Sequence, residues 1–297
     1  MSYKIVEKKK LNDVVYLMDI EAPRVAHSAK PGQFIIVIID EKGERMPLTI
    51  ADYDEERGTV TIVFQVVGFS SKKLGKLEVG DSIKDFVGPL GQPSEFIYES
   101  IDELKNKKMI FIAGGVGAAP VYPQVKWLHE HGVDVDVIIG ARTKDLIIFE
   151  DKMENVAKNL YMCTDDGSYG FHGNVTVMLD ELVTNRGKKY DQAIVIGPMI
   201  MMKFACLATK KLNIPTIVSL NTIMVDGTGM CGACRVSIGD EVKFACVDGP
   251  EFDGWLVNFD EAMKRQQMFK SEEGRKTLRK QDGPTHSSPN CQIGGKH

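Results

Sequence analysis

The sequence predicts an α/β chain with an added all-β domain: an N-terminal antiparallel barrel, a doubly wound parallel sheet and a small C-terminal metal domain. Three observations lead to this fold class. Residues 3–97 read as short strands separated by turn signals, whereas residues 109–220 alternate strand-like and helix-compatible runs. Three cysteines then lie between positions 231 and 246. With 297 residues, the chain is long enough for two domains and a small third one.

Composition and charge exclude several classes of protein. Hydrophobic residues make up 43% of the chain and charged residues 26%, which rules out the disordered and low-complexity classes. No window of about 18 uncharged apolar residues is present and the N-terminus has no apolar signal core, so we expect no membrane contact, no secretion and a cytoplasmic location. The net charge of −4, without a basic stripe interleaved with aromatic residues, argues against nucleic acid as a partner.

The first domain is expected over residues 1–100. Its strands are predicted at 3–8, 14–20, 33–39, 59–67 and 81–87, with turns at Lys30-Pro31-Gly32 and Glu41-Lys42-Gly43. Short strands at this regular spacing are typical of a small antiparallel barrel.

The second domain is expected over residues 101–220. A buried strand at 109–113 leads into Gly114-Gly115-Val116-Gly117 and a helix over 119–131, and further strands are predicted at 133–139, 159–164, 193–196 and 216–220. A glycine loop between a strand and a helix is where backbone N–H groups receive a pyrophosphate. A tight turn without a ligand is the alternative. Pro120 replaces the usual third glycine, and a helix tolerates proline in its first turn.

Two more glycine-bearing loops follow strands of the same predicted sheet, at 164–170 and at Gly197-Pro198-Met199. Ligands of doubly wound sheets bind at the carboxyl ends of the strands. The three loops together favour a nucleotide site at this edge.

The third domain is expected over residues 221–260 and contains the most specific motif. Asp226, Cys231, Cys234 and Cys246 follow the plant-type 2Fe–2S spacing, with Asp in place of the first Cys. Glycines at 227, 229 and 232 would allow the positive φ angles of a loop that wraps around a cluster. Because this segment cannot build a large apolar core of its own, a bound metal centre would stabilise it.

Two alternatives stay open for this motif. One is a zinc site, although structural zinc sites usually pair two close-spaced Cys/His couples and the second couple is missing here. The other is a site of three cysteines completed by Cys206 or Cys291, with Asp226 as a turn residue. Cys163 and Cys206 are otherwise expected to be buried apolar residues.

The last segment, residues 261–297, holds eight Lys/Arg and four Asp/Glu, a charge of +4, which leaves −8 on residues 1–260. An amphipathic helix is predicted over 260–280. The tail either docks on a partner subunit or packs as a solvated helix on its own chain.

The glycine loop, the run 224–235 and the run Phe244-Ala245-Cys246-Val247-Asp248-Gly249-Pro250 together resemble the ferredoxin-NADP reductase superfamily. Within it, the chain is most similar to the family of small subunits of electron-bifurcating NADH-dependent reduced ferredoxin:NADP oxidoreductases. The electron-transfer subunits of dihydroorotate dehydrogenase look more distant, because their first cluster ligand is Cys.

The resemblance implies a set of cofactors and site residues. FAD would lie in the barrel, with Pro47, Leu48 and Thr49 at the flavin, Gly68, Ser70 and Ser71 near its pyrophosphate, and Val66 also in the cofactor-binding set. NAD(H) would be held by Gly114, Gly115, Gly117, Pro120, Arg142, Asp166, Gly197, Pro198 and Met199. The residues do not separate NAD from NADP, since Arg142 could meet a 2′-phosphate or a pyrophosphate.

Arg45 departs from the superfamily pattern. The superfamily has an Arg three positions before the Ser/Thr, and here that place is Met46 while Arg45 stands one residue earlier. Arg45 is therefore either a ligand of the flavin pyrophosphate or a solvated surface charge.

We therefore expect an FAD, 2Fe–2S and NAD(H) oxidoreductase subunit that transfers electrons between NAD(H) and a partner flavoprotein. No side chain is expected to act as a general acid or base, because the redox chemistry belongs to the cofactors. The chain has no second cysteine cluster, so ferredoxin and NADP(H) would react on a larger flavin and iron–sulfur subunit, in a heterodimer. The alternatives are the electron-transfer subunit of dihydroorotate dehydrogenase and a non-catalytic regulatory module.

Overall fold

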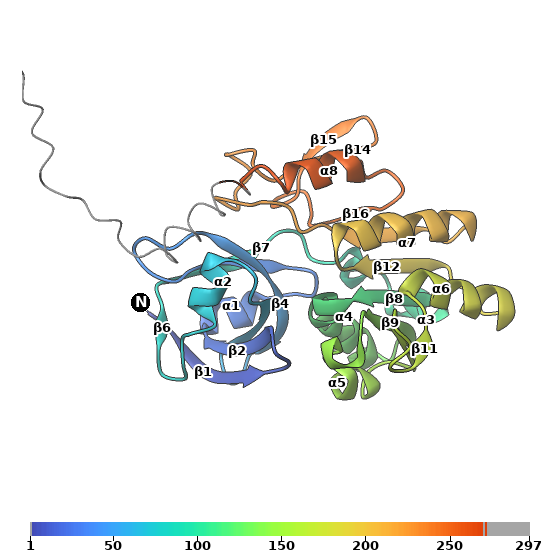
Figure 1. Ribbon diagram of the computed structural model, residues 1–297, viewed down its shortest axis with the longest axis horizontal. Helices are drawn as coiled ribbons and strands as arrows, with labels where there is room; N and C mark the ends of the chain where they lie inside the picture. Colours follow the sequence, from blue (N-terminus) through green and yellow to red (C-terminus); the bar gives the residue numbers. More distant parts are fainter. Residues whose placement is uncertain (1, 270, 272–297) are drawn as a thin grey trace, which may run out of the picture.

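The N-terminal part of the chain is a seven-stranded antiparallel barrel (Figure 1). The structure, a computed structural model, describes residues 2–269 and residue 271. The barrel elements are β1 (Tyr3–Lys10), β2 (Val15–Glu21), α1 (Pro23–Ser28), β3 (Phe34–Ile38), β4 (Met46–Asp54), β5 (Thr59–Gln65), α2 (Phe69–Leu74), β6 (Ser82–Ile83) and β7 (Asp85–Leu90). The strand order is β6-β1-β2-β5-β4-β3-β7, and buried residues such as Ile20, Ile35 and Ile62 fill the interior.

Two details of the barrel differ from the sequence prediction. The run predicted as one strand over 81–87 is two strands, β6 and β7, which break at Lys84. The sequence also does not predict β4, since Pro47 cannot donate a ladder hydrogen bond and three acidic or small residues follow it. This strand nevertheless contributes the barrel face nearest the second sheet.

The second sheet is doubly wound. Its strands are β8 (Met109–Gly114), β9 (Val135–Ala141), β10 (Asn159–Thr164), β11 (Phe171–His172), β12 (Gln192–Ile196), β13 (Thr216–Ser219) and β16 (Glu251–Asp253). They follow the order β11-β10-β9-β8-β12-β13-β16, and all pairs are parallel except β13 with β16.

Helices cover both faces of this sheet, as a parallel sheet requires. They are α3 (Ile101–Asn106), α4 (Ala118–Glu130), α5 (Glu150–Glu154), α6 (Val175–Asp180) and α7 (Met199–Lys211), with short 3₁₀ turns η1 (Glu95–Tyr98), η2 (Gly115–Gly117) and η3 (Lys144–Leu146) and a π-helical turn η4 (Glu181–Asn185). Side chains of α3, α4 and α5 fill one core, whereas α6 and α7 fill the other. Among the described helices, none is both long and apolar enough to cross a membrane.

The C-terminal segment shares the second core instead of forming its own. It contains the hairpin β14 (Arg235–Ile238) with β15 (Glu241–Phe244), the edge strand β16 and helix α8 (Phe259–Arg265). Cys234, Cys246, Phe252 and Phe259 are buried in the same cluster as α6 and α7. Figure 1 shows this segment lying above β12 and α7.

The predicted fold class is confirmed: an antiparallel barrel, a parallel doubly wound sheet and a small C-terminal unit. The proposed boundaries at 100, 220 and 260 stay predictions. The helix predicted over 260–280 starts as α8 and ends its α-helical part at Arg265, while most of its later part lies outside the described residues.

Candidate functional site

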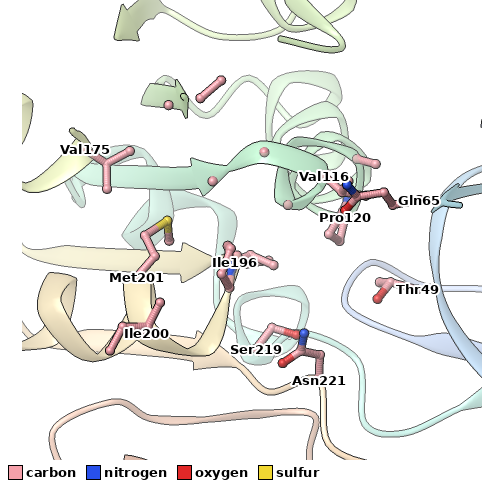
Figure 2. Close-up of a pocket in the computed structure, with 18 of the residues that line it drawn as sticks. Thr49, Gln65, Val116, Pro120, Val175, Ile196, Ile200, Met201, Ser219 and Asn221 are labelled. Atoms are coloured by element: carbon pink, nitrogen blue, oxygen red, sulfur yellow. The ribbon is translucent and has the colours of Figure 1, made fainter. Parts of the chain in front are cut away.

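A large cavity of about 1710 Å³ lies between the barrel and the carboxyl edge of the parallel sheet. Figure 2 shows Thr49 and Gln65 of the barrel on one side, Pro120 of α4 facing them, and Asn221 along the floor. The predicted residues that line it are Pro47, Leu48, Thr49, Ser71, Gly114, Gly115, Gly117, Pro120, Arg142, Gly197 and Pro198. The three predicted loops of the second domain, far apart in sequence, thus meet the barrel at one site, although the 164–170 loop contributes Asp165 and not the predicted Asp166.

The glycines of the first loop do different work. A Cβ on Gly115 would meet nothing within 4 Å, and its φ of +55° is a conformation that side chains rarely adopt. A Cβ on Gly117 would lie 2.2 Å from the carbonyl oxygen of Ile196, and one on Gly114 would lie 2.2 Å from Sδ of Met201. Gly115 therefore faces the open cavity, whereas Gly117 allows the loop to pack against the end of β12 and Gly114 leaves room for Met201 of α7.

Two polar atoms in the cavity wall are buried without a hydrogen-bond partner among the described residues: Nδ2 of Asn12 and Oγ1 of Thr222. Oδ1 of Asn12 accepts the N–H groups of Val14 and Val15, which fixes the direction of the amide. Buried polar groups are almost always paired, so these two fit a polar ligand in the cavity. Sequence reasoning missed both, because neither belongs to a motif.

Several predicted residues lie outside the cavity lining. Val66 packs against the barrel core, and Met199 is buried in the second core. Ser70 is buried and donates to the carboxylate of Glu44. The N–H of Gly68 donates to Oγ of Ser71 at the start of α2.

Asp166 also lies outside the lining, in a surface turn. Its Oδ1 accepts hydrogen bonds from the hydroxyl of Ser168 at 2.6 Å and from the N–H of Ser168 at 3.0 Å. These bonds hold the pKa of Asp166 below its ordinary value. An ionised carboxylate thus stands beside Asp165, which does line the cavity.

In the cluster motif, two of the four predicted ligand side chains are in contact and a third binds backbone N–H groups. Sγ of Cys234 and Sγ of Cys246 are 3.2 Å apart, and both cysteines are buried and free of disulfides. The carboxylate of Asp226 accepts the N–H of Thr228 at 2.9 Å and the N–H of Cys231 at 2.8 Å. These bonds, first the one from Thr228, lower the pKa of Asp226, whereas burial raises the pKa of Cys246 to about 12. The predicted positive φ angles of Gly227, Gly229 and Gly232 are confirmed at +77°, +82° and +66°.

The predicted ligand side chains are not arranged like those of a site for a single metal ion. Across residues 2–269 and 271, no group of three or more His, Cys, Asp or Glu side chains is placed so that it could hold a metal ion. A carboxylate and two thiols on one glycine-rich loop, with the thiol of Cys246 after the hairpin of β14 and β15, nevertheless match the chemistry of an iron–sulfur ligand set. Cys163 and Cys206 are buried in the core, as predicted, and Cys291 lies outside the described residues.

Arg45, just before β4 of the barrel, contacts the loop over residues 224–234, which we call the cluster loop. It is not part of the cavity lining. Its Nε donates to the carbonyl oxygen of Val225, and its Nη2 donates to that of Asp226 at 3.3 Å. A contact between Arg45 and a flavin pyrophosphate therefore gains no support from its position.

Comparison with known proteins identifies the parts of the chain. Residues 111–207 match the oxidoreductase NAD-binding domain, and residues 221–258 match the iron-sulfur cluster binding domain of dihydroorotate dehydrogenase B. A Clostridium beijerinckii protein from the adh 3′ region is 68% identical over 99% of both chains. The dihydroorotate dehydrogenase B (NAD(+)) electron transfer subunit homolog of Thermotoga maritima is 45% identical over 91% of this chain and 92% of that one.

A solved structure is similar over nearly the whole length. The small subunit in the structure of NADH-dependent reduced ferredoxin-NADP oxidoreductase, determined to study flavin-based electron bifurcation, is 42% identical with a TM-score of 0.86. The alignment covers 95% of this chain and 98% of that one. These matches confirm the predicted cofactors, FAD, a 2Fe–2S cluster and NAD(H), and the assignment as an NAD(P)H-linked flavin iron–sulfur oxidoreductase.

Several of the similar proteins are named as electron-transfer subunits, which supports the predicted heterodimer with a larger subunit. The chain belongs to the family of dihydroorotate dehydrogenase B electron-transfer subunits and their homologues, within the ferredoxin-NADP reductase superfamily.

Proposed function

We propose that this chain is the small subunit of an electron-bifurcating NADH-dependent ferredoxin:NADP oxidoreductase, which passes electrons between NAD(H) and a partner flavoprotein. One observation carries the proposal: a single cavity joins the nucleotide loop, the barrel and the segment that leads into the cluster motif. Gly115, Thr49, Asn221 and Met224 all line it, and Asp226 follows Met224 by two residues. Donor, flavin and cluster sites are therefore adjacent within one chain.

In this proposal the loop at Gly115 receives the nicotinamide dinucleotide. The open side of Gly115, the start of α4 and the guanidinium of Arg142 favour a pyrophosphate at this point. Pro47, Leu48 and Thr49 of β4 provide the barrel face for the flavin ring. FAD supplies the exchange between two-electron hydride chemistry and single electrons. The side chains bind, orient and exclude water, and none is assigned a proton transfer.

Asp226, Cys231, Cys234 and Cys246 hold the 2Fe–2S cluster in this proposal. The contact between the thiols of Cys234 and Cys246, and the position of the Asp226 carboxylate against the backbone of Cys231, support a two-iron centre. An Asp ligand keeps the charge of a thiolate at the same chain position. The domains proposed for these cofactors are 1–100 for FAD, 101–220 for NAD(H) and 221–260 for the cluster, followed by the tail 261–297.

Ferredoxin and NADP(H) react on the partner in this proposal. Outside the motif, the full sequence offers only Cys163, Cys206 and Cys291, and the first two are buried in the core. Three scattered cysteines cannot build 4Fe–4S centres. A larger flavin and iron–sulfur subunit must therefore carry those reactions.

A second candidate function is electron transfer to dihydroorotate oxidation. The names of relatives at 45% to 33% identity favour it. The residue that argues against it is Asp226, since the resemblance drawn from the sequence gives the dihydroorotate dehydrogenase subunits a Cys as the first cluster ligand.

The experiment is anaerobic purification of the chain with its native partner, followed by cofactor analysis. We expect about one FAD and two irons in this chain, reduction of both by NADH, and a partner that couples NADPH to ferredoxin. A partner that oxidises dihydroorotate would favour the second candidate. If NADH reduces neither the flavin nor an artificial acceptor, the chain is a regulatory module and the proposal fails.

A further inference from the structure

Two arginines from distant parts of the chain hold the cluster loop. Arg45 precedes β4 of the barrel, and its guanidinium donates to the carbonyl oxygens of Val225 and Asp226. Arg265 is the last residue of α8, and its Nη2 donates to the carbonyl oxygen of Ala233 at 3.2 Å and to that of Gly232 at 3.4 Å. The first arginine thus binds the half of the loop that contains Asp226, and the second binds the half between Cys231 and Cys234.

Arg265 also has an unpaired hydrogen-bond donor in the part of the chain that the structure describes. Nε of Arg265 is buried and has no hydrogen-bond partner among the described residues. A buried N–H without an acceptor is unfavourable, and an arginine has no way to lose the proton. Nη2 of the same guanidinium contacts the backbone between Cys231 and Cys234, so a cluster sulfur held by those cysteines is an acceptor that would suit this donor.

Within residues 2–269 and 271, no carboxylate neutralises the charges of these two arginines. Neither Arg45 nor Arg265 forms an ion pair within 4.0 Å with any residue in the described part of the chain. Three thiolates and the carboxylate of Asp226 would make the loop strongly anionic once loaded. Two half-buried cations beside it are therefore placed to interact with the centre itself.

The barrel segment also contacts the cluster loop and the residues around Cys246 at further points. A Cβ on Gly227 would lie 2.8 Å from side-chain atoms of Ile36 and Leu90, so this part of the loop rests directly on β3 and β7. Nε2 of Gln92 donates to the carbonyl oxygen of Val247, next to Cys246, at 2.9 Å. Arg45 stands two residues before Pro47, which lines the cavity. The cluster loop is consequently tied to the same strand that faces the flavin site.

We propose that Arg45 and Arg265 are positioning residues of the cluster, which fix the two halves of its loop and raise its reduction potential. This inference rests on the proposed role of Asp226 and the three cysteines as ligands. Reduction adds one electron and therefore one negative charge to the centre, and two nearby cations favour that state. Both arginines act through the loop and by charge, and neither takes part in the chemistry.

The test replaces each arginine by an uncharged residue of similar length, Arg45→Gln and Arg265→Gln, in the full chain with its cofactors. Arg24→Gln is the matched control, because Arg24 is an exposed barrel arginine with no contact to the loop. A redox titration followed by electron paramagnetic resonance gives the midpoint potential and the spectrum of the reduced cluster. We expect a negative shift of the potential in both variants, a larger one in the double variant, and none in the control.

Conservative variants separate charge from fold. Arg45→Lys and Arg265→Lys keep the charge, so their potentials should lie closer to that of the wild type than those of the Gln variants. Loss of iron with retained FAD in Arg265→Gln would support the positioning role. Unchanged potentials and spectra in both Gln variants would overturn the inference. A wild-type chain without a cluster would instead overturn the proposed function.

Discussion

Asp226 combines two tasks that its substitutions can separate. Its carboxylate accepts two backbone N–H groups within the loop, from Thr228 and Cys231, and it is also the proposed first ligand. Asp226→Cys should keep a 2Fe–2S centre with an altered absorption and resonance spectrum, because both side chains are anionic ligands at one position. Asp226→Ala should lose or destabilise the centre, measured as iron per chain.

The control for that prediction is Asp248→Ala. Oδ2 of Asp248 accepts the N–H of Phe244 at 2.6 Å, so this variant also removes a carboxylate that holds a loop close to Cys246. It should cost about 1 kcal/mol of stability and leave the cluster intact. An Asp226→Ala chain with the wild-type iron content and spectrum would show that Asp226 is not a ligand.

Glu251 is a buried carboxyl group whose raised pKa gives a testable pH dependence of stability. It lies on β16, where its Oε1 accepts from the hydroxyl of Ser94 and from Nε2 of Gln124, both at 2.9 Å. Desolvation, aided by the nearby charge of Glu95, outweighs the two hydrogen bonds and raises the pKa of Glu251 from 4.5 to about 7. The carboxyl group therefore connects the segment after β7, helix α4 and the edge strand β16. It titrates near neutral pH.

The direction in which Glu251 makes the free energy of unfolding depend on pH follows from proton binding. Between pH 4.5 and 7 the folded chain keeps a proton that the unfolded chain has released, so the contribution to the free energy of unfolding falls as pH rises through this window. Glu251→Gln should abolish this loss, which is on the order of 3 kcal/mol. Urea unfolding at pH 4.5 and pH 8 measures it, with the exposed Glu103→Gln as control. Equal pH profiles in wild type and Glu251→Gln would refute the assignment.

At the scale of elements, the strand–loop–helix unit of β8, η2 and α4 makes the clearest prediction. Gly115 is the loop glycine that is open to the cavity, so Gly115→Ala should weaken NADH binding about tenfold or more, or roughly 1.4 kcal/mol. FAD content should not change, since the flavin face belongs to the barrel. Titration of the anaerobic chain with NADH measures the affinity.

Gly187 offers a matched control for this substitution. Its φ of +67° is close to that of Gly115, and a Cβ there would also meet nothing within 4 Å, but it does not line the cavity. Gly187→Ala should therefore impose the same backbone strain of about 1 kcal/mol and leave the affinity for NADH unchanged. If both variants bind NADH equally well, the pyrophosphate does not lie against Gly115.

The elements also show what the sequence can and cannot predict. The alternation of strands and helices and the spacing from Asp226 to Cys246 are local patterns, and the structure and the comparisons confirm the fold and the cofactors that they indicate. Which loop glycine faces the cavity depends on Ile196 of β12, some eighty residues along the chain, because a Cβ on Gly117 would meet it. Contacts of Arg45 and Arg265 with the loop likewise depend on tertiary packing and leave no local signal.

At the scale of the whole molecule, two features tie the three parts together. After the cluster loop, the chain returns as β16 and pairs with β13, so the cluster segment shares the sheet of the nucleotide domain. Asp52 of β4 forms ion pairs with Lys126 of α4 at 2.8 Å and with Lys152 of α5 at 3.5 Å. The sites proposed for NAD(H), FAD and the cluster are thereby held at fixed separations, as electron transfer between them requires.

The tail is the part of the molecule in which docking to a partner can be tested. Helix α8 cannot be removed for this purpose, because Arg265 contacts the cluster loop and Nε2 of Gln266 donates to the carbonyl oxygen of Asn221 at 2.8 Å. A cut after Phe259 would therefore disturb the cluster as well as the tail. A cut after Phe269 removes only residues 270–297, which hold six Lys/Arg and three Asp/Glu, a charge of +3.

Truncation after Phe269 should weaken the heterodimer and spare the cofactors. If the basic tail lies along an acidic surface of the larger subunit, the loss of affinity should be large at low salt and should shrink as salt screens the charges. Calorimetric titration with the partner at two ionic strengths measures this, while iron, FAD and NADH-driven dye reduction should equal those of the full chain. Truncation after Phe259 is the comparison, and it should also lower the iron content. A chain cut after Phe269 that binds the partner as tightly as the full chain at both ionic strengths would leave the tail without a docking role.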